Sequence, residues 1–270
     1  MNPPAWREAI QVAVTARELL IALDFDGTLA PLVPRPEDAR MLPQLVALLE
    51  QLVQLPATTT VLVSGRAGDS LAACAEVPRS MRAIGSHGAQ WGTIEIDSDG
   101  NRTFAAKAVA LSAEARHLHT RLCAAIDDIV ATHPGTSAEY KPAGVVLHVR
   151  EADRQVGQDA LQAARRGPAS WDGVTSLAGK AVLELSVVRA TKGDALKKLV
   201  AETGATCVLY AGDDVTDESA FHMVSHLDVA GVSIKVGEGE SCANLRVADG
   251  AELGELLAEI ARQRHHLAHT

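Results

Sequence analysis

Two aspartates spaced two residues apart, Asp24 and Asp26, follow the apolar run at 19–23. Side chains alternate along a strand, so residues at i and i+2 leave the chain on the same side. Packing does not explain two carboxylates at the end of a buried strand, because like charges repel each other and resist desolvation. For this pair alone, an acidic turn that caps a strand is an alternative interpretation, since short motifs often match by chance.

Further polar clusters stand at the ends of expected strands or at the starts of expected helices. The first cluster is the aspartate pair together with Thr28. The others are Ser64 with Arg66, Thr191 with Lys192, and Asp213 with Asp214 and Asp217. Strands that alternate with helices predict an open parallel sheet, in which right-handed crossovers bring such clusters to one edge. Up to five carboxylates at that edge would repel one another without a divalent cation, and an all-oxygen donor set suits Mg²⁺.

A site with Mg²⁺, a lysine and small hydroxyls is equipped to handle a phosphoryl group. The negative charge of that group must be neutralised before an anionic nucleophile can approach it. A carboxylate can be the nucleophile, through an aspartyl-phosphate intermediate. A second carboxylate two residues away can protonate the leaving oxygen and then deprotonate water. The clusters therefore favour phosphoryl transfer.

The elements that must position these clusters alternate between helices and strands. Hydrophobic spacing predicts helices at 5–17, 42–55, 192–202 and 217–224 and from residues 69 and 251 onward. Apolar and β-branched runs predict strands at 19–23, 58–63, 81–84, 206–211 and 229–236. Three prolines within 31–36 exclude regular structure there, and the segment 97–101 predicts a hairpin turn.

Residues 107–187 follow a different order. A helix at 109–131 precedes strands at 137–140 and 145–149, and a helix at 153–165 precedes strands at 173–177 and 181–185. Helix, strand and strand repeated twice are typical of a compact α+β unit. The fold class that we expect is therefore α/β, with a Rossmann-like parallel-sheet core from 1–106 and 188–270 and an inserted, smaller α+β domain at 107–187.

Composition excludes several classes of partner. Over 270 residues, 47% are hydrophobic, enough for one large or two smaller cores, and the net charge of −9 argues against nucleic acid or an anionic membrane. The four cysteines form no CxxC pair, which favours reduced thiols in the cytoplasm over zinc or disulfides. The N-terminal residues lack the apolar run of a signal peptide, and no stretch approaches the roughly 20 apolar residues of a membrane span. We expect a cytoplasmic protein; its oligomeric state stays open, and a monomer is compatible with the sequence.

Four motifs resemble those of the haloacid-dehalogenase-like phosphatases, in the same order along the chain. They are Asp24-Phe25-Asp26-Gly27-Thr28, Ser64, Lys192, and the run from Gly212 to Glu218. For catalysis the resemblance implies Asp24 as the nucleophile, Asp26 as acid and base, and Lys192. For phosphate binding it implies Thr28, Ser64, Gly65 and Lys192. For Mg²⁺ it implies Asp24, the carbonyl of Asp26, and Asp213, supported by Asp214 or Asp217.

Within this superfamily the chain is similar to the trehalose-6-phosphate phosphatases. The similarity rests on the runs at 23–31, 64–66, 85–88, 139–141, 148–150, 179–184 and 212–218. It implies Mg²⁺-dependent hydrolysis of trehalose 6-phosphate in trehalose biosynthesis. Because the insertion lies between the second and third motifs, it also implies a mobile cap domain that recognises the sugar. The substrate-binding residues that it implies are Arg66, His87, Glu139, Lys141, Arg150 and Glu184.

The residues of the insertion support this interpretation without requiring it. Glu139 and Lys141 share one face of a short strand, and Glu184 lies on another strand of the same small sheet. Carboxylates and a lysine that converge can bind vicinal sugar hydroxyls. A solvated, charged sheet face is the alternative.

Three more residues suit two roles each. His87 and His148 fit either a substrate site or a hydrogen-bonded packing position, and Arg66 fits either the substrate or neighbouring carboxylates. Three departures from the family pattern, Gln90, Val149 and Ser186, bear on the sugar rather than on the phosphoryl chemistry. The alternative functions are a phosphatase for another sugar phosphate, such as a glycosyl-phosphoglycerate or sucrose phosphate, and a non-catalytic sugar-phosphate sensor.

Overall fold

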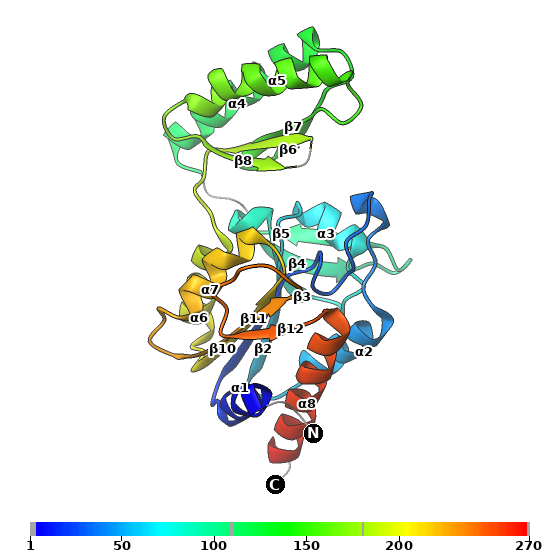
Figure 1. Cartoon of the computed structure of the whole chain (residues 1–270), viewed down its shortest axis with the longest axis vertical. Coiled ribbons are helices and arrows are strands. Elements are labelled where there is room, and N and C mark those ends of the chain that lie inside the picture. Colours follow the sequence, from blue (N-terminus) through cyan, green and yellow to red (C-terminus); the bar gives the residue numbers. More distant parts are fainter. Residues whose placement is uncertain (1–3, 108–110, 180, 269–270) are drawn as a thin grey trace. The chain divides into compact units, whose positions relative to one another are not determined.

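The chain forms two compact units (Figure 1). A computed structural model describes residues 4–107, 111–179 and 181–268. The core unit comprises Met1–Lys107 and Ala190–Thr270, and the insert unit comprises Ala108–Arg189. The fold is the α/β class predicted from the sequence, with a parallel-sheet core and a smaller α+β unit.

The core unit contains an eight-stranded sheet in the order β12-β11-β10-β1-β2-β3-β4-β5. Neighbours from β12 to β3 pair in parallel, whereas β4 and β5 pair antiparallel at one side. The strands are β1 (Leu19–Leu23), β2 (Thr58–Val63), β3 (Met81–Gly85), β4 (Gln90–Ile96), β5 (Arg102–Ala106), β10 (Cys207–Gly212), β11 (Ala230–Val236) and β12 (Leu245–Val247). Since β1 lies between β10 and β2, the aspartates that follow it emerge at the middle of the carboxyl edge.

Helices cover both faces of this sheet, which explains why β1 is apolar at every position. Side chains from α1, α2, α3 and α8 pack on one face with Leu19, Ile21 and Leu23, and those from α6 and α7 pack on the other with Leu20 and Ala22. Figure 1 shows α8 and α6 on opposite sides of the sheet. The helices are α1 (Pro4–Thr15), α2 (Pro43–Leu52), α3 (Gly68–Cys74), α6 (Lys192–Thr203), α7 (Glu218–Val224) and α8 (Gly250–Ala268). Among the described residues, no helix is long and apolar enough to cross a membrane.

Arg264, near the end of α8, ties that helix to the end of α1. Its side chain is buried, and its guanidinium donates hydrogen bonds of 2.9–3.3 Å to the carbonyls of Ala13, Val14, Ala16, Pro56 and Ala57 and to the hydroxyl of Thr58. The last carbonyls of a helix have no partner within it, and a cation there also interacts favourably with the helix dipole. Arg264 therefore stabilises the side of the core unit opposite the aspartates.

The insert unit is a four-stranded antiparallel sheet in the order β6-β7-β9-β8, with two helices on one face. Its elements are α4 (Ala113–Thr132), β6 (Ser137–Lys141), β7 (Gly144–His148), α5 (Arg154–Arg166), β8 (Thr175–Gly179) and β9 (Val182–Ser186). Val145, Leu147 and Leu185 point into the helix side. The alternate positions, among them Glu139, Lys141 and Glu184, therefore share the helix-free face.

The element boundaries differ from the sequence-based prediction in places. The helix predicted from residue 109 begins at Ala113, and residues 108–110 and Lys180 lie outside the described residues. β8 begins two residues later than predicted, because Gly173 takes a left-handed turn conformation with φ of 82°, and β9 lies one residue later than predicted. The prediction missed β12, whose three residues are too few to show a period.

Candidate active site

The predicted clusters of the core unit surround one cavity of about 530 Å³ at the carboxyl ends of β1, β2 and β10. The predicted site residues that line it are Asp24, Asp26, Ser64, Gly65, Arg66, His87, Lys192, Asp213 and Asp214. Two others lie beneath this surface: Thr28 is 1% exposed, and Asp217 is fully buried. The hydroxyl oxygen of Thr28 is buried and has no hydrogen-bond partner among the described residues.

Lys192 lies between two buried carboxylates. It is the first residue of α6, whose start is fixed by a capping box between Thr191 and Asp194. Its Nζ lies 2.8 Å from Oδ1 of Asp24 and 2.7 Å from Oδ1 of Asp217. Burial alone lowers the pKa of Lys192, but the charges of both aspartates overcome this effect and hold the pKa above its usual value. Lys192 is therefore a fixed cation at the floor of the cavity.

Asp24 is 4% exposed, and the pKa of its carboxyl group is shifted from the usual value. Burial raises its pKa well above the usual value, Lys192 opposes the increase, and the charge of Asp217 adds to it. Asp213 behaves in the same way: burial and then the charge of Asp217 raise its pKa to about 6. The crowding of carboxyl groups that the sequence indicated is therefore present in the fold.

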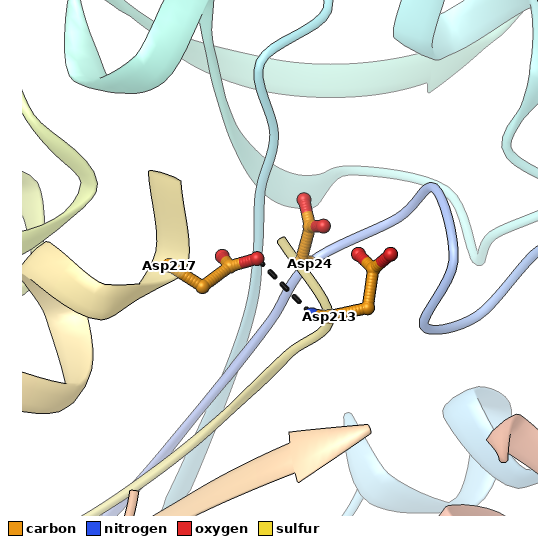
Figure 2. A group of neighbouring side chains, drawn as sticks. All are labelled: Asp24, Asp213 and Asp217. Atoms are coloured by element: carbon orange, nitrogen blue, oxygen red, sulfur yellow. Dashed lines mark hydrogen bonds between the residues drawn. The ribbon is translucent and has the colours of Figure 1, made fainter. Parts of the chain in front are cut away.

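Asp217 supports this cluster from below. Its Oδ1 accepts hydrogen bonds from Lys192 and from the hydroxyl of Tyr210, at 2.7 and 2.6 Å. Its Oδ2 accepts from the backbone nitrogens of Asp213 and Asp214, at 3.1 and 2.9 Å, and Figure 2 shows the first of these bonds. Both oxygens are thus engaged, and Asp217 holds the turn after β10 in place.

This cluster fits a hard divalent cation. One carboxylate oxygen from each of Asp24, Asp213 and Asp217 lies within 4.8 Å of the others (Figure 2). Because the oxygens of Asp217 already accept hydrogen bonds, Asp24 and Asp213 are the carboxylates left for a metal. An all-oxygen donor set suits Mg²⁺, and a cation would offset the burial and the like-charge repulsion that raise the pKa values of Asp24 and Asp213.

Two glycines allow the carboxylates to approach the backbone. Gly27 has a φ of 73°, and a Cβ on it would lie 1.9 Å from Oδ2 of Asp213. A Cβ on Gly212 would lie 2.2 Å from Cγ of Asp217. A side chain at either position would overlap a carboxylate, which explains why each aspartate motif includes a glycine.

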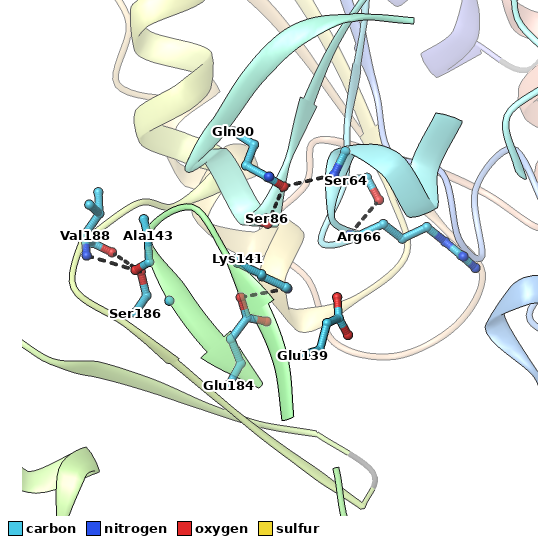
Figure 3. A network of polar contacts seen from close by, with 12 residues as sticks. Ser64, Arg66, Ser86, Gln90, Glu139, Lys141, Ala143, Glu184, Ser186 and Val188 are labelled. Atoms are coloured by element: carbon cyan, nitrogen blue, oxygen red, sulfur yellow. Dashed lines mark hydrogen bonds and ion pairs between the residues drawn. The ribbon is translucent and has the colours of Figure 1, made fainter. Parts of the chain in front are cut away.

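The loop after β2 is fixed by the turn at residues 85–88. The backbone nitrogen of Arg66 donates to Oγ of Ser64 at 3.1 Å (Figure 3), and its carbonyl accepts from the nitrogen of Ser86 at 2.7 Å. A Cβ on Gly65 would lie 2.5 Å from Cε1 of His87, so this imidazole covers the glycine. Ser86 and His87 both have positive φ, of 48° and 54°, a strain of roughly 1–3 kcal/mol each that is typical of functional sites.

Arg66 makes one of the two contacts that its sequence position suggested. Its guanidinium binds both carboxylate oxygens of Asp26, at 2.6 and 2.7 Å. In this structure Arg66 is therefore bound to a neighbouring carboxylate.

The sequence did not single out Tyr210 or Lys235, and it gave Gln90 only as a departure from the family pattern. Lys235 lies on β11, is 5% exposed, and donates a hydrogen bond from Nζ to the backbone carbonyl of Asp213. Oε1 of Gln90 accepts from Oγ of Ser86 (Figure 3) and also from the backbone nitrogen of Gly68. The only signal for Lys235 in the sequence was a lysine within a mostly apolar strand.

Three of the four predicted substrate residues of the insert unit are engaged by neighbouring side chains. Nζ of Lys141 lies 3.0 Å from Oε1 of Glu184, with side chains 8% and 18% exposed (Figure 3). Glu139 lies 3.0 Å from Nε2 of His148, a hydrogen bond that lowers the pKa of Glu139. Arg150 is exposed in the turn after β7, and no ion pair joins it to this group within the described part of the chain.

Two of the sequence departures also have defined contacts. Oγ of Ser186 accepts a hydrogen bond from the backbone nitrogen of Val188 at 3.2 Å and lies 3.0 Å from the carbonyl of Ala143 (Figure 3). Val149 is buried in the apolar core of the insert unit. Neither side chain offers a free polar group on the helix-free face.

Comparison with known proteins agrees with this geometry. The model of the trehalose-phosphatase family matches residues 22–250, which include every motif described above. The chain belongs to the trehalose-phosphatase family. The trehalose-6-phosphate phosphatase of Escherichia coli is 31% identical over 229 residues, which cover 83% of this chain and 80% of that protein.

A bifunctional trehalose-6-phosphate synthase/phosphatase of Thermoproteus tenax is 31% identical over 258 residues. That match covers 91% of this chain but 32% of the relative, so the chain spans about a third of the bifunctional protein. A crystal structure of a trehalose-6-phosphate phosphatase related protein has a TM-score of 0.68 at 28% identity, covering 92% of this chain and 99% of that one. The C-terminal domain of the Candida albicans trehalose-6-phosphate phosphatase has a TM-score of 0.70 at 20% identity, covering 95% and 96%, which supports the fold.

Proposed function

We propose that this chain is an Mg²⁺-dependent phosphatase that hydrolyses trehalose 6-phosphate to trehalose and phosphate. The observation that carries the proposal is the position of Asp24, buried at the end of the central strand with Lys192 at 2.8 Å and Asp213 close by. Membership of the trehalose-phosphatase family supports the same activity.

In the proposed reaction Asp24 attacks phosphorus and forms an aspartyl-phosphate. Lys192, as a fixed cation, offsets the charge that develops on the phosphoryl oxygens. Asp26 protonates the leaving sugar oxygen and then takes a proton from the water that hydrolyses the intermediate. The hydroxyl of Thr28, which has no partner among the described residues, supplies a hydrogen bond to phosphate, and Ser64 and the backbone of Gly65 supply others.

The residues that would hold Mg²⁺ are Asp24, the carbonyl of Asp26, and Asp213, with Asp217 fixing the turn that carries Asp213 and Asp214 beside it. When bound, the metal neutralises phosphoryl charge that would otherwise repel the Asp24 carboxylate. Lys235 contributes by binding the carbonyl of Asp213 from β11. The roles of these side chains are therefore complementary: Asp24 and Asp213 bind, whereas Asp217 and Lys235 orient.

We further propose that the insert unit is a cap domain that recognises the sugar. Glu139, Lys141 and Glu184 share its helix-free face, and their carboxylates and ammonium can exchange their mutual contacts for sugar hydroxyls. His87 and Arg150 remain further candidates for contacts with the substrate. Closure of the cap would exclude bulk water until the intermediate has formed.

A phosphate-release assay over a panel of sugar phosphates, with and without EDTA, tests this proposal. We expect release from trehalose 6-phosphate that exceeds release from sucrose phosphate and a glycosyl-phosphoglycerate, and that stops when EDTA removes the metal. Asp24→Asn should fold normally and lose at least about 10³-fold in kcat. Binding of the sugar phosphate without release by the wild type would instead indicate a sensor, and substantial turnover by Asp24→Asn would refute Asp24 as the nucleophile.

A further inference from the structure

The guanidinium of Arg66 holds the Asp26 carboxylate through both of its oxygens. Nε lies 2.7 Å from Oδ2 and the second nitrogen, Nη2, lies 2.6 Å from Oδ1. The side chain of Arg66 is 8% exposed and that of Asp26 is 34% exposed. Within the described residues, Arg66 is the side chain that hydrogen-bonds this carboxylate.

Arg66 is itself fixed from several directions. Its guanidinium carbon lies 5.4 Å from the centre of the Phe25 ring, a cation–π contact. Nη2 also donates to the carbonyl of Pro36 at 2.8 Å. Its backbone is bound on one side by Ser64 and on the other by Ser86. Because the loop after β2 fixes Arg66, the arginine in turn fixes the carboxylate of Asp26 after β1.

We propose that Arg66 is a positioning residue that acts through Asp26 rather than through the substrate. The inference rests on the proposed function, in which Asp26 transfers protons. A carboxylate has about four acceptor positions, and a planar guanidinium fork occupies two of them. The fork fixes the plane of the Asp26 carboxylate and leaves one position on each oxygen, so proton transfer to the leaving oxygen starts from a defined geometry.

A double-mutant cycle in kcat distinguishes this role from direct substrate binding. We expect Arg66→Met to lower kcat for trehalose 6-phosphate by about 10-fold or more, with a smaller change in KM, because misplacing a catalytic group by a small distance is costly. In an Asp26→Ala background, the same substitution should change kcat by less than about twofold. Losses that multiply would show that Arg66 acts directly on the substrate and would overturn the proposal.

The leaving group provides a second test. A sugar alkoxide requires protonation, whereas p-nitrophenolate leaves without it, so Arg66→Met should affect trehalose 6-phosphate more strongly than p-nitrophenyl phosphate. Guanidinium ions at millimolar concentration should partly restore Arg66→Ala on the sugar phosphate, and sodium chloride of equal ionic strength should not. Arg35→Met is the matched control, since Arg35 pairs with Asp38 on the surface nearby. Equal losses on both substrates would contradict the proposal.

Unfolding measurements separate the failure of this inference from failure of the proposed function. In thermal unfolding without substrate, Arg66→Met and Asp26→Ala should each lower the Tm. The double variant should lose much less than the sum of the two single losses, because each substitution removes the same pair of hydrogen bonds. Arg66→Lys, which keeps the charge but cannot form the fork, gives a second variant for the same cycle. Additive losses would overturn the inference alone, whereas a wild type inactive on every sugar phosphate would overturn the proposed function and this inference with it.

Discussion

Asp217→Asn separates a residue that supports the metal site from one that binds the metal. The wild-type carboxylate is fully buried and accepts four hydrogen bonds, two on each oxygen. An asparagine of the same shape replaces one oxygen with an NH₂ group, which is a donor. In one orientation this donor faces Lys192 and Tyr210, and in the other it faces the backbone nitrogens of Asp213 and Asp214.

The size of the effect follows from this count. In one orientation the hydrogen bonds from the two backbone nitrogens are lost; in the other the bond from Lys192 is lost, while the Tyr210 hydroxyl can turn and accept from the NH₂ group. Bonds to a charged acceptor contribute about 1.5–3 kcal/mol each. The neutral asparagine also removes one partner of the buried ion pair with Lys192, a change that typically costs about 3–5 kcal/mol. We therefore expect the free energy of unfolding of the core unit to fall by about 3–5 kcal/mol, or roughly 6–20 °C in Tm at 2–4 °C per kcal/mol.

Thermal unfolding in EDTA measures this loss in the absence of metal. Asp214→Asn is the matched control, because the neighbouring Asp214 side chain is exposed and should change stability by less than about 0.5 kcal/mol. If Asp217 were instead a metal ligand with a free oxygen, Asp217→Asn would relieve repulsion. The metal-free variant would then be as stable as the wild type, and the loss would appear only with Mg²⁺. That result would refute the assignment of Asp217 to a supporting role.

Three further outcomes are expected. Arg264→Met should lower the free energy of unfolding by about 3 kcal/mol in urea denaturation, because it leaves buried carbonyls unpaired. Arg262 is exposed on the same helix, and Arg262→Met should have little effect in the same measurement. Mg²⁺ should raise the Tm of the wild type by mass action and should raise that of Asp213→Asn much less, as differential scanning fluorimetry would show; equal shifts would contradict metal binding there. Glu184→Ala should raise KM for trehalose 6-phosphate far more than for p-nitrophenyl phosphate, and equal changes would exclude sugar recognition by the insert unit.

Local patterns determined the elements because the hydrophobic period reports which side of each element is buried. The strand expected at 58–63 matches β2, and the strand at 19–23 matches β1. The parallel order then places the residues after these strands at one edge, so the association of Asp24, Lys192 and Asp213 around one cavity followed from the sequence. Short or irregular elements such as β12 escaped the prediction because three residues carry too little pattern.

The sequence by itself determined which carboxylates, hydroxyls and lysine meet at the end of the central strand, since strand polarity and crossover handedness fix that edge. Only the tertiary structure decided what each does with its neighbours. Asp214 and Asp217 look equivalent in the sequence, but one is exposed and the other is buried with both oxygens engaged. Arg66 and Asp26, 40 residues apart, become a single fork, because hydrogen bonds between distant side chains depend on distances and angles that no spacing along the chain encodes.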